Sequence, residues 1–232
     1  MGYMKTRREK GVNRMSEREW IEELLKINDE DLQLSEKQSK IIEAAIEVFS
    51  EKGFAAASTN EIAKKAGVAE GTIFRHYKTK KELLFSIVTP TLVKVVAPFF
   101  AKGFVREVFT NEHQSYEDFL RLLITNRLDF VKKHFPIIKI FLQEIPFHDE
   151  LKEQYRQVFT ENVYHKFTSI VQHFQEKGEI IDFPSDTVIR ITMTNIIGYL
   201  ITRFLVLPEK DWDDAQEIEN TIHFLMHGLS PK

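Results

Sequence analysis

The chain of 232 residues contains no cysteine. Disulfide bonds and thiolate metal sites are therefore excluded, and the composition fits a protein of the reducing cytoplasm. Long uninterrupted apolar stretches are also lacking, since the most apolar run, Val188–Leu207, is broken by Arg190 and Arg203. We expect this run to form a buried core or interface helix rather than a membrane span, and no signal peptide is visible at the N-terminus.

The sequence shows no sustained alternation of apolar and polar residues that would predict β-strands, and no internal repeat. It has no glycine-rich nucleotide-binding motif, no nucleophile elbow and no zinc-protease helix motif. His223 and His227 have a spacing that can hold a metal, but no third ligand accompanies them, so packed interface histidines are the preferred interpretation. We therefore expect an all-α protein that is not an enzyme and has neither metal nor cofactor.

The charge of the chain is small in total but unevenly distributed. The net charge is −3, yet residues 53–82 hold six Lys or Arg against three Asp or Glu. Residues 83–232 hold sixteen Lys or Arg against twenty Asp or Glu. A weakly basic segment on an acidic body is typical of a specific DNA-binding protein.

Residues 57–82 carry the most informative pattern in the chain. Ser58 followed by Glu61 predicts a capping box at the start of a first short helix, and Gly67 predicts its left-handed end. A second helix is expected from Glu70 to about Tyr77. Two short helices joined by a glycine-containing turn are typical of a helix-turn-helix, whose second helix enters the DNA major groove.

The helical wheel of the second helix separates an inner face from an outer one. Ile73 and Tyr77 share the face that must pack inward, while Phe74 and Arg75 lie on the opposite side. Arg75 is expected to reach a base edge or phosphate, and exposed Phe74 a thymine methyl or sugar. Phosphate contacts are expected from the Ser58 backbone and from Thr59, Lys78 and Lys80. The predicted DNA-binding residues are Ser58, Thr59, Asn60, Gly71, Thr72, Phe74, Arg75, His76, Lys78 and Lys80.

Residues 38–85 resemble the DNA-binding domain of the tetracycline-repressor (TetR) family. The resemblance rests on the apolar pattern of residues 41–49, on Ser58–Ala63 with Ala66–Val68, and on Gly71–Lys80. Two positions depart from the family pattern: Phe74 replaces a common Tyr, and Glu70 stands where a basic or small polar residue is more usual. The resemblance implies a homodimeric regulator that binds double-stranded operator DNA and a small-molecule effector.

The chain divides on this basis into three parts: an N-terminal extension at 1–34, a helix-turn-helix domain at 35–82, and an effector-binding and dimerisation domain at 83–232. The extension begins with a basic arm at 1–15, which is a candidate for tracking DNA, and a capped helix is expected from Ser16. Further helices are expected at 35–52, 80–96, 115–134, 136–146, 149–177, 185–207 and 212–228.

The effector domain is rich in Phe, and polar residues are interleaved with the Phe residues on helices expected to face inward. An apolar cavity with a few convergent polar groups is the usual form of a small-molecule site. The candidate ligand-binding residues are Phe99, Arg127, Phe141, Glu144, Tyr164, Thr168, Asn195 and Tyr199.

The sequence is therefore interpreted as a cytoplasmic, homodimeric transcriptional regulator of the TetR type. We expect a repressor that leaves a palindromic operator when a small, largely apolar ligand binds. Two alternatives stay open: a helical enzyme or scaffold of similar outline, and a regulator controlled by a protein partner instead of a ligand.

Overall fold

The computed structural model describes residues 35–96 and 115–229, and every regular element in these two ranges is helical. The predicted basic arm, the helix from Ser16 and Phe99 lie outside these residues. The helices are α2 (Glu36–Ala56), α3 (Thr59–Ala66), α4 (Glu70–His76), α5 (Lys80–Val96), α7 (Tyr116–Glu144), α8 (Asp149–Phe159), α9 (His165–Glu176), α10 (Ser185–Ile201) and α11 (Asp214–Leu229). The all-α prediction is confirmed.

Several helix ends are fixed by the residues that the sequence indicated. Ser115 and Asp118 form a reciprocal capping box at the start of α7, and Gly178 takes a left-handed conformation with φ of 70° after α9. The predicted box between Ser58 and Glu61 is only half correct. Ser58 caps α3 by accepting a hydrogen bond from the backbone N–H of Asn60, whereas Glu61 forms an ion pair with Lys52 of α2.

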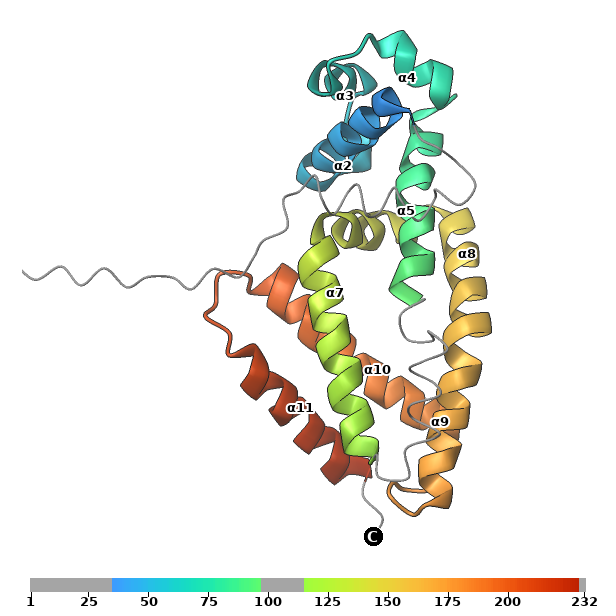
Figure 1. Ribbon diagram of the computed structural model, residues 1–232, viewed down its shortest axis with the longest axis vertical. Helices are drawn as coiled ribbons and strands as arrows, with labels where there is room; N and C mark the ends of the chain where they lie inside the picture. Colours follow the sequence, from blue (N-terminus) through green and yellow to red (C-terminus); the bar gives the residue numbers. More distant parts are fainter. Residues whose placement is uncertain (1–34, 97–114, 230–232) are drawn as a thin grey trace, which may run out of the picture.

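Helix α7 is long and kinked. The sequence predicted two helices that separate near Pro136, but the structure has one helix with a non-helical residue, His134, at φ −119° and ψ 19°. Proline lacks a backbone N–H and clashes with the preceding turn, so a kink two residues before Pro136 has an evident cause. The break changes the direction of α7 without ending it (Figure 1).

The two halves of α7 pack into two different apolar cores. Ile137 and Ile140, which follow the kink, join the core of the helix-turn-helix together with α5 and Leu151 of α8. The first half of α7 packs with α9, α10 and α11 in a second core. Because the first core contains residues on both sides of position 82, the head formed by α2–α4 is packed directly onto the effector body.

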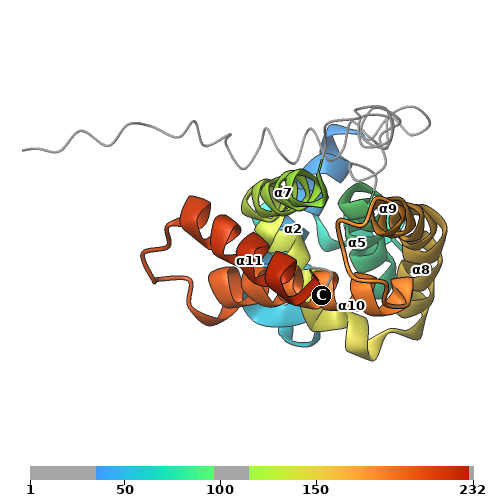
Figure 2. The same ribbon diagram turned by 90° about the horizontal axis from the view of Figure 1, so that it is seen from below.

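Helix α10 joins the other helices of the body near the C-terminus. Viewed from below, α10 lies between α11 on one side and α9 on the other, and α10 contacts both (Figure 2). A π-helical segment, Thr202–Val206, continues α10, and another, Thr160–Tyr164, joins α8 to α9. The combined helix Ser185–Val206 has the length and composition of a membrane span, although core helices share both properties. Val188, Ile189 and Ile196 place part of it in the second core.

Candidate DNA-binding head and ligand cavity

The helix-turn-helix is closed by a tight turn between α3 and α4. Gly67 adopts a left-handed conformation with φ of 68°, and its N–H bonds back to the carbonyl of Lys64. The N–H of Val68 reaches the carbonyl of Ala63, which completes the turn. α3 and α4 then lie together at the far end of the molecule from α11 (Figure 1).

The predicted faces of α4 are confirmed by burial. Ile73 is completely buried and Tyr77 nearly so, while Phe74 is 45% exposed. Arg75 and His76 are exposed in the last turn of the helix, and Gly71 is exposed in the first. An aromatic ring beside an exposed arginine on the outer face of the helix can reach base edges, sugars and phosphates in a groove.

The N-terminal ends of α3 and α4 are joined through one carboxylate. Glu70 Oε1 accepts a hydrogen bond from Thr59 Oγ1 at 2.6 Å, and Glu70 Oε2 accepts one from Asn60 Nδ2 at 3.4 Å. Both donors are among the predicted DNA-binding residues. In the free protein, they are oriented by Glu70 and do not simply face solvent.

Lys80 has a different role from the one predicted for it. Its ammonium group donates to the backbone carbonyls of Phe54 at 2.6 Å and Ala57 at 2.9 Å, and it lies 4.4 Å from the centroid of the Phe54 ring. A lysine that satisfies carbonyls at the end of α2 is held by the fold, so it is poorly placed to hold a phosphate. Lys78, by contrast, is exposed.

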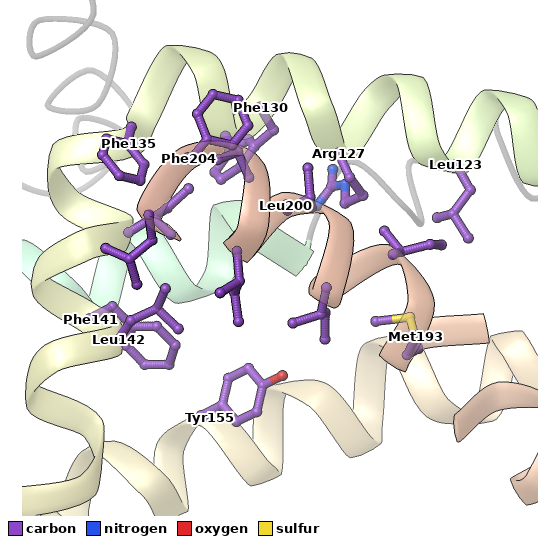
Figure 3. Close-up of a pocket in the computed structure, with 16 residues that line it drawn as sticks. Leu123, Arg127, Phe130, Phe135, Phe141, Leu142, Tyr155, Met193, Leu200 and Phe204 are labelled. Atoms are coloured by element: carbon purple, nitrogen blue, oxygen red, sulfur yellow. The ribbon is translucent and has the colours of Figure 1, made fainter. Parts of the chain in front are cut away.

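The effector body contains a cavity of about 190 Å³ at the kink of α7. Its walls come from both halves of α7, from α8 and from α10 (Figure 3). The lining residues are Leu123, Arg127, Phe130, Val131, Phe135, Ile138, Phe141, Leu142, Tyr155, Met193, Ile196, Ile197, Leu200, Ile201, Phe204 and Leu205. Almost all are apolar, and Arg127 and Tyr155 supply the polar groups.

Two of the predicted ligand-binding residues, Arg127 and Phe141, line this cavity. The others that the structure describes are engaged elsewhere. Glu144 bonds to the head, and Tyr164 bonds to Asp186. Thr168 and Asn195 bond to carbonyls of their own helices, and Tyr199 bonds to Asp214. All five are buried or half-buried, but none of them lines this cavity.

The cavity residues that sequence reasoning missed are mainly on α10. Met193 and Leu200 of α10, and Phe204 of the π-helical segment that continues it, lie on a helix that is apolar around most of its circumference, so its sequence does not reveal which side faces a cavity. Tyr155 sits on α8, where five of the ten other residues are charged. An aromatic residue on a largely polar helix was the one available signal.

Arg127 is the only cationic residue among those that line the cavity. It is 6% exposed, and its guanidinium donates to Asn126 and lies 5.2 Å from the centroid of the Phe130 ring. Burial lowers the pKa of Arg127 to about 9, because a charged guanidinium is poorly solvated among apolar side chains. An anionic group in the cavity would be favoured by this charge.

The cavity and the DNA-binding head share a boundary. Phe141 and Tyr155 line the cavity and also pack against the first core, with their ring centroids 5.6 Å apart. One turn after Phe141, Glu144 accepts a hydrogen bond from the backbone N–H of Phe54 at 3.2 Å and lies 3.5 Å from His148 Nε2. The end of α2 is thus bonded directly to the end of α7.

The histidine pair at the C-terminus has no further metal-binding partners in the described parts of the chain, where no group of three or more such ligands gathers. The rings of His223 and His227 are 3.8 Å apart at their centroids, and His227 Nδ1 lies 2.8 Å from the His223 carbonyl. This geometry is that of two packed histidines on one helix face.

Comparisons with known proteins agree with the geometry of the head. Residues 41–87 match the family described as bacterial regulatory proteins, tetR family. The Fatty acid metabolism regulator protein of Bacillus subtilis is 45% identical over 51 residues, which span 22% of this chain and about a quarter (26%) of that protein. The HTH-type transcriptional regulator YvkB of the same organism is 27% identical over 193 residues, 82% of this chain and 96% of its own length.

The fold is likewise that of known regulators. The solved structure of the transcriptional regulator FadR from Bacillus subtilis in complex with stearoyl-CoA superimposes with a TM-score of 0.59. The sequence identity is 21%, and the superposition covers 82% of this chain and 97% of that one. At this level of identity, the similarity supports the fold of the body and not its ligand.

The head, its exposed recognition face and the helical body define a helix-turn-helix DNA-binding transcriptional regulator. Its DNA-binding domain, matched over residues 41–87, belongs to the TetR family.

Two lysines of the head should respond differently to truncation. Lys78→Ala should reduce the slope of log affinity against log salt concentration by about one unit per bound subunit, because each subunit loses one phosphate contact. Lys80→Ala should leave that slope unchanged and destabilise the fold by about 1.5–3 kcal/mol, because charge-assisted hydrogen bonds to carbonyls are lost. Fluorescence anisotropy at several salt concentrations and thermal melting measure the two effects. A flattened slope with an unchanged melting temperature for Lys80→Ala would restore its predicted role.

Proposed function

We propose that the protein is a homodimeric repressor that binds a palindromic operator and releases it when an apolar ligand with an anionic head group occupies the cavity. The observation that carries this proposal is the shared boundary of cavity and head: Phe141 and Tyr155 belong to both. A ligand that displaces either ring acts on the packing of the helix-turn-helix itself. We place the protein in the cytoplasm, with the DNA that it reads.

The composition of the cavity supports a ligand of the fatty-acid type. A purely apolar cavity of about 150 Å³ accommodates benzene, so 190 Å³ accommodates an acyl segment of modest length. A carboxylate or phosphate next to Arg127 would offset the cost of burying the guanidinium. The regulators of fatty acid metabolism among the relatives, one of them solved with stearoyl-CoA, support the same ligand class.

Two contacts connect the cavity with the head. α5 runs from the head along α8, and Leu84 and Val88 of α5 are buried in the first core (Figure 1). The second contact is the Glu144–Phe54 hydrogen bond at the end of α7. A small rotation of the second half of α7 about its kink would move both α5 and the end of α2. A palindromic operator tolerates little change in the spacing of the two recognition helices, because they must fit grooves about 34–36 Å apart.

Dimerisation through α10 and α11 is supported by the apolar groups that these helices leave exposed. Ile197, Leu205 and Val206 are 41%, 46% and 60% exposed, and Phe224 of α11 is 64% exposed. Exposed apolar residues on two adjacent helices are typical of an interaction surface. A two-fold pairing of α10 and α11 with their mates would cover it.

The central experiment is to select operator DNA from random sequence and then to titrate ligands into the complex. We expect dodecanoate, and long-chain acyl-CoA if the cavity widens, to release the DNA. By thermodynamic reciprocity, operator DNA should weaken ligand binding by the same factor, typically ~5–150-fold. Equal ligand affinity with and without operator would exclude ligand-induced release and favour control by a protein partner. A protein that selects no sequence would favour the enzyme or scaffold alternative.

The role of Arg127 predicts a difference between dodecanoate and dodecanol. The wild-type protein should prefer the carboxylate, and Arg127→Met should abolish this preference with a loss of about 10–100-fold in dodecanoate affinity. Arg156→Met is the matched control, since it removes an exposed cation paired with Glu153 on α8. Calorimetry with both ligands measures the effect. A preference for dodecanoate that survives in Arg127→Met would place the anionic head elsewhere.

The role of Glu144 predicts a separation of ligand binding from DNA release. Glu144→Ala removes the acceptor for the Phe54 N–H, so ligand affinity without DNA should change little while the coupling factor falls by about fivefold or more. Glu153→Ala, an exposed change on α8, should leave both unaltered. Anisotropy titrations with and without dodecanoate give the coupling factor. An unchanged factor would leave α5 as the sole route.

The dimer surface predicts the effect of one charge. Phe224→Glu should shift the protein towards monomer at micromolar concentration, because a carboxylate would be buried against an apolar mate. Phe147→Glu is the matched control, since Phe147 is 79% exposed on a turn outside α10 and α11. Sedimentation velocity distinguishes the two variants. A wild-type protein that sediments as a stable monomer would refute the proposed dimer.

A further inference from the structure

Glu70 is an acidic residue at the start of α4, the helix that carries exposed Phe74 and Arg75. It is the first residue of α4, and the preceding Ala69 gives the helix no side-chain cap. Its two hydrogen-bond donors, Thr59 and Asn60, are neutral side chains. A carboxylate at the edge of a DNA-binding surface is repelled by phosphates. This repulsion lowers the affinity for DNA unless the carboxylate makes a favourable contact with it.

The position of Glu70 points to the bases. The N-terminal residues of a recognition helix are the ones that contact base edges in the major groove. Thr59 and Asn60 lie at the start of α3, and each donates a hydrogen bond to one of the two carboxylate oxygens of Glu70. A carboxylate has about four acceptor positions, and two neutral hydrogen bonds leave capacity for a donor from DNA.

A carboxylate can only accept hydrogen bonds, and this restricts the base that it can read. In the major groove, guanine presents the acceptors O6 and N7, and thymine presents the acceptor O4. Adenine presents its N6 amino donor next to the acceptor N7. Cytosine presents its N4 amino group as a donor. We propose that Glu70 reads a cytosine in each half of the operator, and that Thr59 and Asn60 are positioning residues that orient its carboxylate.

This inference rests on the proposed DNA-binding function and makes the pattern of contacts more specific. It also explains why Thr59 and Asn60 are engaged in the free protein: they prepare an acceptor for a base in addition to any phosphate contact. Specificity for cytosine would be supported by repulsion of the other bases as well as by attraction.

The test is selection from random double-stranded DNA with the full chain and with Glu70→Gln. The wild type should require cytosine at one position of each half-site, with a preference of roughly 5–150-fold over the other bases. Glutamine can donate and accept, and it pairs with adenine N6 and N7. Glu70→Gln should therefore change the preference at that position from cytosine to adenine and leave the other positions unchanged.

Two further variants separate base reading from simple charge removal. Glu61→Gln removes an equal charge from α3, where Glu61 pairs with Lys52, and should strengthen binding to all sequences without changing any base preference. Thr59→Val removes a donor to Glu70 and should weaken the cytosine preference at the same position only.

The proposal is overturned if Glu70→Gln strengthens binding to all sequences alike, as Glu61→Gln should, or if the wild-type half-site shows no cytosine preference that Glu70→Gln alters. In both cases the wild type still selects an operator, so DNA binding itself stands. A wild-type protein that selects no sequence at all overturns the proposed function together with this inference.

Discussion

The packing of this protein depends on the break in α7. Pro136 prevents a straight helix, and the non-helical backbone at His134 directs the first half of α7 into one core and the second half into another. A straight helix of the same length could not pack along both. The cavity lies where the two halves diverge, so the constraint imposed by one proline produces both the attachment of the head and the space for a ligand.

The head could be predicted closely because its signals are local. Ser58 as a cap, Gly67 at a left-handed position, and the spacing of Ile73 and Tyr77 are each determined within a few residues. Lys80 shows the limit of this reasoning. Its charge suggested a phosphate contact, but the carbonyls that it satisfies belong to residues more than twenty positions earlier, and no periodicity in the sequence reveals them.

The cavity was harder to predict for the same reason. Arg127 and Phe141 were identified because polar and aromatic residues interleave on α7, yet Glu144, one turn from Phe141, turned out to bond to the head. α10 is apolar on most sides, so burial in a core, exposure at a surface and lining of a cavity all require the same residue types. Only the arrangement of neighbouring helices distinguishes these environments.

The walls of the cavity differ in how freely they can be altered. Phe141 and Tyr155 also support the DNA-binding head, whereas Met193 and Leu200 on α10 contribute to the cavity from another helix. Changes on α10 can therefore reshape the cavity while sparing the head. For a biosensor with a new ligand, libraries should vary α10 and keep Phe141 and Tyr155 constant, so that altered recognition is not obtained at the expense of the packing of the head.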